Sequence, residues 1–155
     1  FLGGLARTTA DVALLLDAAG KRVILVETVG VGQDEVDIVK LADCTLVVLM
    51  PGSGDEVQAI KAGIMEIADI FVINKADREG TDRFEQQLMA MLSLAPQRDG
   101  WSPPVVRSVA TEDKGTVEVV AAIEKFRAHF AAAALRNVKN VERLKQRLLE
   151  LLQAR

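Results

Sequence analysis

The sequence predicts an α/β fold: a mostly parallel sheet with helices on both faces. Short runs of apolar, largely β-branched residues recur along the chain, and amphipathic stretches of about ten or more residues separate them. Strands that alternate with helices in this way form parallel βαβ units. Because ligands bind at the carboxyl ends of the strands in such sheets, functional residues are expected directly after each apolar run.

The first elements are a helix and a buried strand. Thr8 or Thr9 can cap a helix whose apolar residues recur at helical spacing as far as Gly20, which stands at a stop position. The unbroken run Val-Ile-Leu-Val at residues 23–26 predicts a strand that is buried on both faces. A short helix over residues 36–40 is expected to follow.

Three more apolar runs and the helices that follow them complete the α/β pattern. The strands are expected at residues 45–50, 70–73 and 105–108. The helices are expected at residues 55–68, 81–94 and 116–134.

The composition excludes several classes of protein. Of 155 residues, 50% are apolar and 26% are charged, which is too apolar for a disordered chain. A net charge of -3 lacks the basic field of a nucleic-acid-binding module. No apolar run reaches the roughly 18–20 residues of a membrane span. The single cysteine, Cys44, cannot form an internal disulfide. We therefore expect neither a nucleic-acid nor a membrane partner.

The last 21 residues, 135–155, differ from the rest of the chain. Apolar residues follow a 3-4-3 spacing between charged ones, at Val141, Leu144, Leu148 and Leu151. This seam is too short to be a stable coiled coil alone. We expect residues 1–134 to form the main domain and residues 135–155 a helical extension, which either packs on that domain or begins a dimerisation arm.

A carboxylate stands at the end of the first expected strand. Glu27 follows residues 23–26, and Gly30 comes three residues later. A carboxylate oxygen suits Mg²⁺, directly or through water. A glycine lets a backbone N–H approach a phosphate closely. A plain strand-to-loop turn explains the same residues, so this pair alone leaves both interpretations open.

The motif Asn-Lys-Ala-Asp at residues 74–77, after the strand at 70–73, is more specific. The carboxylate of Asp77 can accept hydrogen bonds from N1–H and the 2-amino group of guanine, a donor pair that adenine lacks. Asn74 can tie neighbouring loops together, and the Lys75 stem can lie over the base. The alternative is an Asn/Asp turn that caps the next helix.

A turn of small residues, Ser108, Val109 and Ala110, follows the last expected strand. Such a turn can bring a backbone N–H to the O6 atom of guanine. This turn comes about thirty residues after the motif at 74–77, and the three strand-end motifs at 27–30, 74–77 and 108–110 together predict a guanine-nucleotide site more strongly than each does alone.

These segments resemble conserved GTPase motifs. Residues 27–30 resemble the third motif, residues 74–77 the fourth and residues 108–110 the fifth. The third motif usually begins with Asp, and Glu in its place resembles a branch of P-loop GTPases that act as metallochaperones and cofactor chaperones. Within that branch the chain resembles the MeaB/ArgK type over roughly residues 1–130, chiefly in the stretches 2–7, 27–33 and 51–64.

The resemblance implies a P-loop NTPase fold and a chaperone that binds and hydrolyses GTP with Mg²⁺. Such a chaperone gates the loading and protection of methylmalonyl-CoA mutase or a related acyl-CoA mutase, and the cobalamin belongs to that partner. The resemblance also implies a homodimer, in the cytoplasm of a bacterium or the mitochondrial matrix of a eukaryote. The older family name, LAO/AO transport system kinase, leaves a kinase of an amino-acid transport system as an alternative.

The resemblance also assigns roles to residues outside the base motifs. Glu27 is implied to bind Mg²⁺ through water and Gly30 to sense the γ-phosphate. Gln33 can be interpreted as a residue that positions the attacking water, by analogy with other GTPases. Residues 52–63 resemble switch III, the segment that relays the nucleotide state to the mutase. Its candidate relay residues are Asp55, Gln58 and Lys61. A solvated helix face is the alternative interpretation of these three.

One GTPase motif has no match in the sequence. The phosphate-binding loop G-x-x-x-x-G-K-[ST] is absent from residues 1–155, and the order of motifs places it before Phe1. We therefore expect the chain to be the C-terminal part of a GTPase domain that lacks its N-terminal strands. The alternative is that this piece alone is a catalytically inactive structural or interaction fragment.

Overall fold

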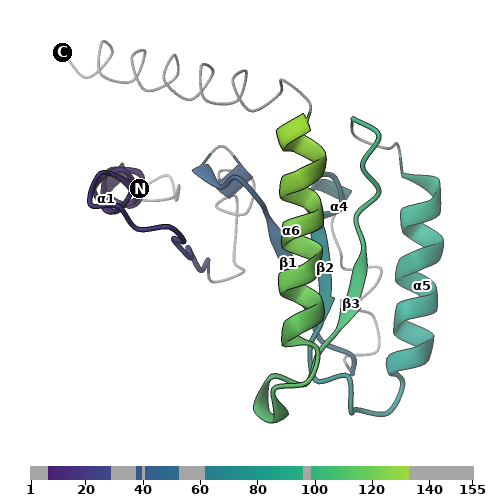
Figure 1. The fold of residues 1–155 in the computed structure, drawn as a ribbon. Helices are drawn as coiled ribbons and strands as arrows, with labels where there is room; N and C mark the ends of the chain where they lie inside the picture. Colours follow the sequence, from purple (N-terminus) through teal and green to yellow (C-terminus); the bar gives the residue numbers. More distant parts are fainter. Residues whose placement is uncertain (1–6, 29–37, 40, 53–61, 96–98, 133–155) are drawn as a thin grey trace. The chain divides into compact units, whose positions relative to one another are not determined.

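The structure is a computed structural model that describes residues 7–28, 38–39, 41–52, 62–95 and 99–132 (Figure 1). The chain divides into two compact units, residues 1–43 and residues 44–155, and each unit is described by itself. None of the helices in the described part combines the length and the apolarity that a membrane span needs.

The second unit contains a three-stranded parallel sheet. Its strands are β1 (Leu46–Leu49), β2 (Ile70–Ile73) and β3 (Val105–Arg107), in the spatial order β1-β2-β3. The register pairs Leu49 with Ile73 and Ile73 with Arg107, so the three strands end level with one another. The strands expected in this part of the chain are therefore confirmed, and the one at 70–73 has the expected bounds.

The described residues of this unit contain three α-helices. They are α4 (Ala62–Ile67), α5 (Thr81–Leu94) and α6 (Thr116–Ala132). The bounds of α5 are those that the sequence predicts. Residues 55–61 of the expected first helix and residues 133–134 of the expected last helix lie outside the described residues, and so does the expected extension at 135–155.

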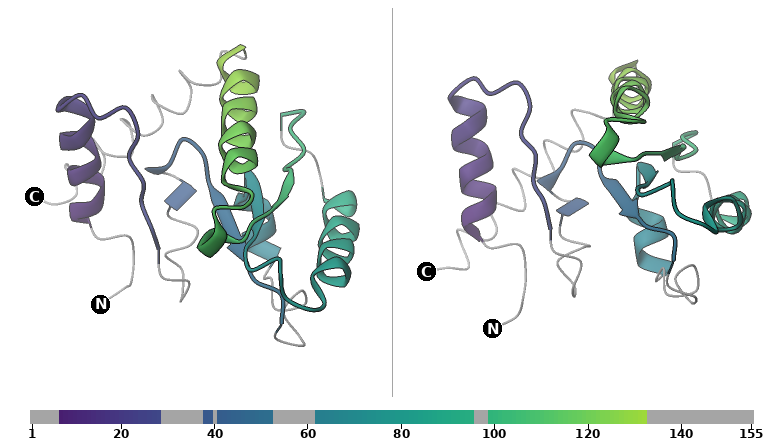
Figure 2. Two further views of the ribbon diagram at one scale, coloured as in Figure 1. Left: turned by 60° about the horizontal axis from the view of Figure 1, so that its bottom comes forward. Right: turned by 90° about the horizontal axis from the view of Figure 1, so that it is seen from below.

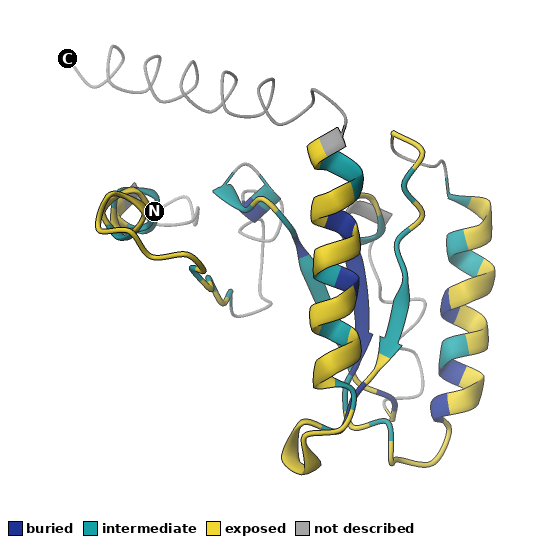
Figure 3. Ribbon diagram, viewed as in Figure 1, coloured by how far each residue is buried: buried dark blue, intermediate teal, exposed yellow. Residues whose placement is uncertain are grey.

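The buried core forms around strand β2, because helices cover both faces of this strand (Figures 2 and 3). Phe71 and Ile73 face α5 and pack in a buried cluster with Phe84 and Leu88. The alternate residues of β2 face α6, where Ile70 and Val72 cluster with Ala122 and Phe126. Alternation along one strand thus places a helix on each face of the sheet, which confirms the predicted fold class.

Buried polar groups join the amino ends of the strands. The Asp69 carboxylate accepts a hydrogen bond from the Thr45 backbone N–H at 2.8 Å. The Trp101 indole Nε1–H donates to the Asp69 carbonyl at 2.8 Å. The Trp101 ring also meets Phe126 edge to face, at 5.3 Å between ring centroids. These contacts fix the loop before β3 at the edge of the sheet opposite to the strands' carboxyl ends.

The first unit contains α1 (Arg7–Ala18). The expected stop is confirmed: Gly20 has a φ of 77°, the Gly20 N–H donates to Asp17 O, and the Lys21 N–H donates to Leu16 O. This pair of bonds is a Schellman motif, which satisfies the last helical carbonyls. The expected cap at Thr8 or Thr9 is wrong, because α1 already begins at Arg7 and both threonines lie inside its first turn.

The expected strand at residues 23–26 is also not observed. The structure assigns no β-structure there, and Val23 and Leu25 are 74% and 91% exposed. A strand is defined by the ladder that it shares with a neighbour, and none of the described strands pairs with this segment. Of the short helix expected at 36–40, only Ile38 and Val39 are described, and both are helical.

Candidate functional site

Two loops lie together at the carboxyl ends of β2 and β3, at the lower end of the sheet in Figure 1. Backbone hydrogen bonds continue the ladder into these loops. The Asn74 N–H donates to Leu49 O at 2.8 Å, and the Ser108 N–H donates to Ile73 O at 2.8 Å. The Ala76 N–H donates to Ser108 O at 3.0 Å, which joins loop 74–77 directly to loop 108–110.

The side chain of Asn74 ties the two loops together a second time. Its Oδ1 accepts hydrogen bonds from the Lys75 N–H at 2.8 Å, the Ala110 N–H at 3.2 Å and the Ser108 hydroxyl at 3.3 Å. One carboxamide oxygen thus accepts hydrogen bonds from three donors, two of which belong to loop 108–110.

Loop 74–77 is a tight turn with an exposed carboxylate. Lys75 has a φ of 56°, a left-handed conformation that is uncommon outside glycine and that clusters at functional sites. The Arg78 N–H donates to Lys75 O at 3.0 Å and closes the turn. Asp77, within this turn, is exposed.

The motif does not cap the helix that follows it. The N-cap residue of α5 is Gly80, in a left-handed conformation and without a side-chain cap hydrogen bond. The buried Thr81 hydroxyl donates to Arg78 O at 2.7 Å instead. The alternative interpretation of residues 74–77, an Asn/Asp turn that caps the next helix, is therefore wrong.

Residues 109–115 turn back on the end of β3, and we call this segment the hook. The Val109 N–H donates to Lys114 O at 2.9 Å, and the Lys114 N–H donates to Val109 O at 3.3 Å. The Lys114 ammonium pairs with the Glu112 carboxylate at 2.5 Å. The hydrogen bond to Glu112 and its charge raise the pKa of Lys114, and the Asp77 carboxylate adds a smaller contribution.

Two residues at this edge escaped the sequence analysis. Gly115 closes the hook with a φ of 83°, and a Cβ there would lie 2.1 Å from Arg107 O. Arg107 pairs with Asp82 at 2.8 Å and with Glu85, both on α5, and these partners, Glu85 first, raise its pKa. The sequence signal for Gly115 was a glycine just ahead of the helix expected at 116–134. The ion pairs of Arg107 had no sequence signal, because they join β3 to another element.

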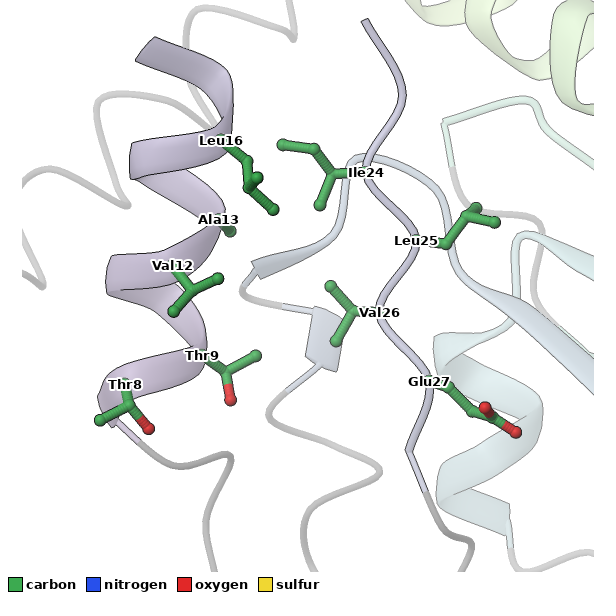
Figure 4. Close-up of a pocket in the computed structure, with 9 residues that line it drawn as sticks. All are labelled: Thr8, Thr9, Val12, Ala13, Leu16, Ile24, Leu25, Val26 and Glu27. Atoms are coloured by element: carbon green, nitrogen blue, oxygen red, sulfur yellow. The ribbon is translucent and has the colours of Figure 1, made fainter. Parts of the chain in front are cut away.

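The other predicted site residues are not brought to this edge by any described contact. Glu27 belongs to the first unit, where it is exposed and lines an open hollow of about 320 Å³ between α1 and residues 24–27 (Figure 4). Gly30 and Gln33 lie outside the described residues, as do the switch III candidates Asp55, Gln58 and Lys61. Within the described segments, no group of three or more His, Cys, Asp or Glu side chains is placed to hold a metal ion.

The loop pair offers a set of groups that a planar base can use. Asp77 supplies two acceptor oxygens, Ala110 supplies a backbone N–H, and Lys75 supplies an apolar stem with a charged tip. All three stand at the carboxyl edge of a parallel sheet, where α/β proteins bind ligands.

A solved structure supports the same class of fold. The chain is similar to the protein of a crystal structure described as LAO/AO transport system kinase, with a TM-score of 0.78 and 32% identity. The match covers 93% of this chain and 48% of that one. The fold is therefore that of the P-loop NTPase class, as the sequence predicts.

The family model described as methylmalonyl Co-A mutase-associated GTPase MeaB matches residues 1–155. The chain therefore belongs to the MeaB family. A protein of Pyrococcus abyssi that is named as a GTPase is 51% identical over 150 residues, 95% of this chain and 46% of that protein. GTPase ArgK of Escherichia coli is 35% identical over 157 residues, 96% of this chain and 47% of ArgK.

A mitochondrial relative is also similar. The mouse protein named methylmalonic aciduria type A homolog is 36% identical over 136 residues, 85% of this chain and 33% of that protein. The chain thus spans about half of the length of the Pyrococcus abyssi protein and of ArgK, and a third of the mouse protein.

Proposed function

We propose that this chain carries the guanine-recognition part of a GTPase of the MeaB family. The observation that carries the proposal is the Asn74 carboxamide, which accepts from both the Ser108 hydroxyl and the Ala110 N–H. It holds loop 108–110 beside the turn that presents Asp77. A carboxylate and a backbone N–H thereby lie at the same edge of the sheet, where each can bind a different side of a guanine base.

Each residue of the loop pair has a distinct role in this proposal. Asp77 accepts hydrogen bonds from N1–H and the 2-amino group of guanine, and the Ala110 N–H donates to O6. In the structure that N–H points at Asn74 Oδ1 over 3.2 Å, a long hydrogen bond that a carbonyl oxygen can replace. Lys75 covers the base with its stem, while Ser108 and Val109 form the backbone that aims Ala110.

The proposed reaction is hydrolysis of GTP, a phosphoryl transfer to water that depends on positioning and electrostatics. Glu27 fits Mg²⁺ as an exposed carboxylate, because Mg²⁺ takes oxygen ligands and retains several waters beside one or two carboxylates. The ion would supply charge neutralisation at the phosphates. Gly30 is proposed to sense the γ-phosphate and Gln33 to orient the attacking water.

The proposed partner is methylmalonyl-CoA mutase or a related cobalamin-dependent mutase. The family's description as mutase-associated and the name of the mouse relative support this assignment. We propose that Asp55, Gln58 and Lys61 relay the nucleotide state to the mutase. We also propose that residues 1–134 are part of the GTPase domain, that residues 135–155 extend it toward a homodimer, and that the protein works in the cytoplasm or the mitochondrial matrix.

The proposal is tested by exchanging the carboxylate that reads guanine. In the complete protein, Asp77→Asn should weaken GDP binding on the order of 100-fold, because a hydrogen bond to a charged group contributes about 1.5–3 kcal/mol. The same variant should strengthen binding of xanthosine diphosphate, whose C2 oxygen accepts a hydrogen bond from the new amide. Isothermal titration with the two diphosphates measures both changes.

A matched control is Asp113→Asn, which removes an exposed carboxylate from the hook. Its φ of 54° suits Asn as well as Asp, so the backbone is unaffected. This variant should keep the wild-type preference for GDP. An Asp77→Asn protein whose ratio of GDP to xanthosine diphosphate affinity equals that of the wild type contradicts the assignment.

A further inference from the structure

The hook reverses the chain within seven residues, 109–115, and brings Gly115 back onto the last residue of β3. Asp113 and Gly115 both have left-handed backbones, with φ values of 54° and 83°. The antiparallel bridge between Val109 and Lys114 closes the reversal. Helix α6 then begins, with the Val119 N–H donating to Gly115 O at 3.0 Å.

Backbone atoms fill the place that a side chain of residue 115 would need. A Cβ there would lie 2.1 Å from Arg107 O, 2.8 Å from Ser108 Cα and 3.0 Å from Arg107 C. Real Cβ atoms essentially never come within 3.0 Å of such atoms, and a strand backbone cannot rotate away as a side chain can. Any residue other than glycine must therefore displace either the end of β3 or the hook, which contains Ala110.

Gly115 differs in this respect from the other left-handed glycines of the described chain. A Cβ at Gly20, Gly80 or Gly100 would meet nothing within 4 Å, and one at Gly52 would meet only the flexible Arg78 side chain at 3.9 Å. The left-handed backbone is common to all of them. The close approach is what sets Gly115 apart, so the requirement for glycine there is steric as well as conformational.

The residue that Gly115 contacts leads directly to the proposed O6 donor. Ser108 is joined to β2 through its N–H and to loop 74–77 through its carbonyl, and Ala110 follows two residues later. A displacement at Arg107 and Ser108 would therefore move the Ala110 N–H. Asp77 follows Ala76, whose N–H donates to Ser108 O, but the turn at Asp77 is also closed without β3, by the Arg78 N–H that donates to Lys75 O.

We propose that Gly115 is a specificity-determining positioning residue, which holds the Ala110 N–H at the place of guanine O6 by its backbone contact with Arg107 and Ser108. This inference rests on the proposed function. It distinguishes the two halves of base recognition: the O6 half depends more strongly on Gly115 than the half that reads N1–H and the 2-amino group, because Ala110 lies in the hook and Asp77 does not.

Three diphosphates distinguish the two halves in the complete protein. GDP presents every group, 6-thio-GDP replaces O6 with sulfur, a weak acceptor, and inosine diphosphate lacks the 2-amino group. Gly115→Ala should weaken GDP binding about tenfold, the loss of one hydrogen bond. The preference for GDP over 6-thio-GDP should fall toward one, while the preference for GDP over inosine diphosphate should fall by a clearly smaller factor.

Gly100→Ala is the matched control, because it introduces the same methyl group at a φ of 72° into open space. It should leave both preferences unchanged. Should Gly115→Ala fail to fold, Gly115→Asn carries the same Cβ on a residue that tolerates the left-handed region, and the same selective loss is expected.

The outcomes separate this inference from the proposal beneath it. A wild-type protein that does not prefer GDP over both analogues contradicts the guanine site itself. When the wild-type protein has both preferences, the folded Gly115 variant tests the role of Gly115 alone. That role is overturned if the variant still discriminates against 6-thio-GDP or loses both preferences equally.

Discussion

Replacing Asn74 with alanine should loosen the joint between the two loops. In the structure its Oδ1 accepts one hydrogen bond of 2.8 Å from the Lys75 N–H. It accepts two longer ones, of 3.2 and 3.3 Å, from the Ala110 N–H and the Ser108 hydroxyl. Asn74→Ala removes this acceptor and leaves the backbone ladder between Asn74 N and Leu49 O in place.

The expected loss of stability follows from the number and the exposure of these bonds. A hydrogen bond within a protein contributes about 0.5–1.5 kcal/mol net, and the two long bonds should lie at the low end of that range. Lys75 and Ala110 are exposed, so water can satisfy their N–H groups, whereas Ser108 is only 9% exposed. We therefore expect Asn74→Ala to lower the free energy of unfolding by about 2 kcal/mol.

Urea unfolding of the complete protein at 25 °C measures this change as a shift of the midpoint at constant slope. Asn74→Asp keeps an oxygen acceptor at the same position and should stay within about 0.5 kcal/mol of the wild type. The reasoning is refuted when Asn74→Ala is as stable as the wild type, or when Asn74→Asp loses as much stability as Asn74→Ala.

The remaining predictions concern the core and the partner. Leu88→Ala should destabilise the protein by about 2–5 kcal/mol in urea unfolding, because the side chain is fully buried beside Phe71 and Ile73. Met89→Ala, on the same helix but 52% exposed, should cost under about 1 kcal/mol, and equal losses would contradict the core assignment. Lys61→Ala should preserve GTP binding but weaken the change in GTP hydrolysis that the mutase produces, whereas Lys125→Ala, an exposed lysine of α6, should not. Undiminished stimulation of the Lys61 variant would reject its relay role.

The sequence predicted the bounds of those elements whose own residues determine them. The four apolar residues of β2 and the amphipathic period of α5 were sufficient for their bounds, because both faces of β2 and one face of α5 are buried. The run at residues 23–26 is as apolar as β2, yet it forms no strand in the structure. A strand also needs a neighbour with which to pair, and a single run carries no information about its neighbour.

The site shows the same division between local and long-range information. Asn74, Lys75 and Asp77 form one short motif, so their residue types and spacing could be interpreted directly. The hydrogen bonds from Ser108 and Ala110 to Asn74 span 34 and 36 residues, and only the parallel register of β2 and β3 brings the partners together. The position of Gly115 just ahead of a helix does not reveal its role, because the requirement for glycine arises from a contact with Arg107 that the hook creates.

The most direct test of the guanine assignment is a crystal structure of the complete protein with GDP and Mg²⁺. Both Asp77 carboxylate oxygens should lie within about 2.7–3.2 Å of N1 and the 2-amino nitrogen, and the Ala110 nitrogen at a similar distance from O6. A guanine base that is bound away from loops 74–77 and 108–110, or one that Asp77 does not contact, would contradict it.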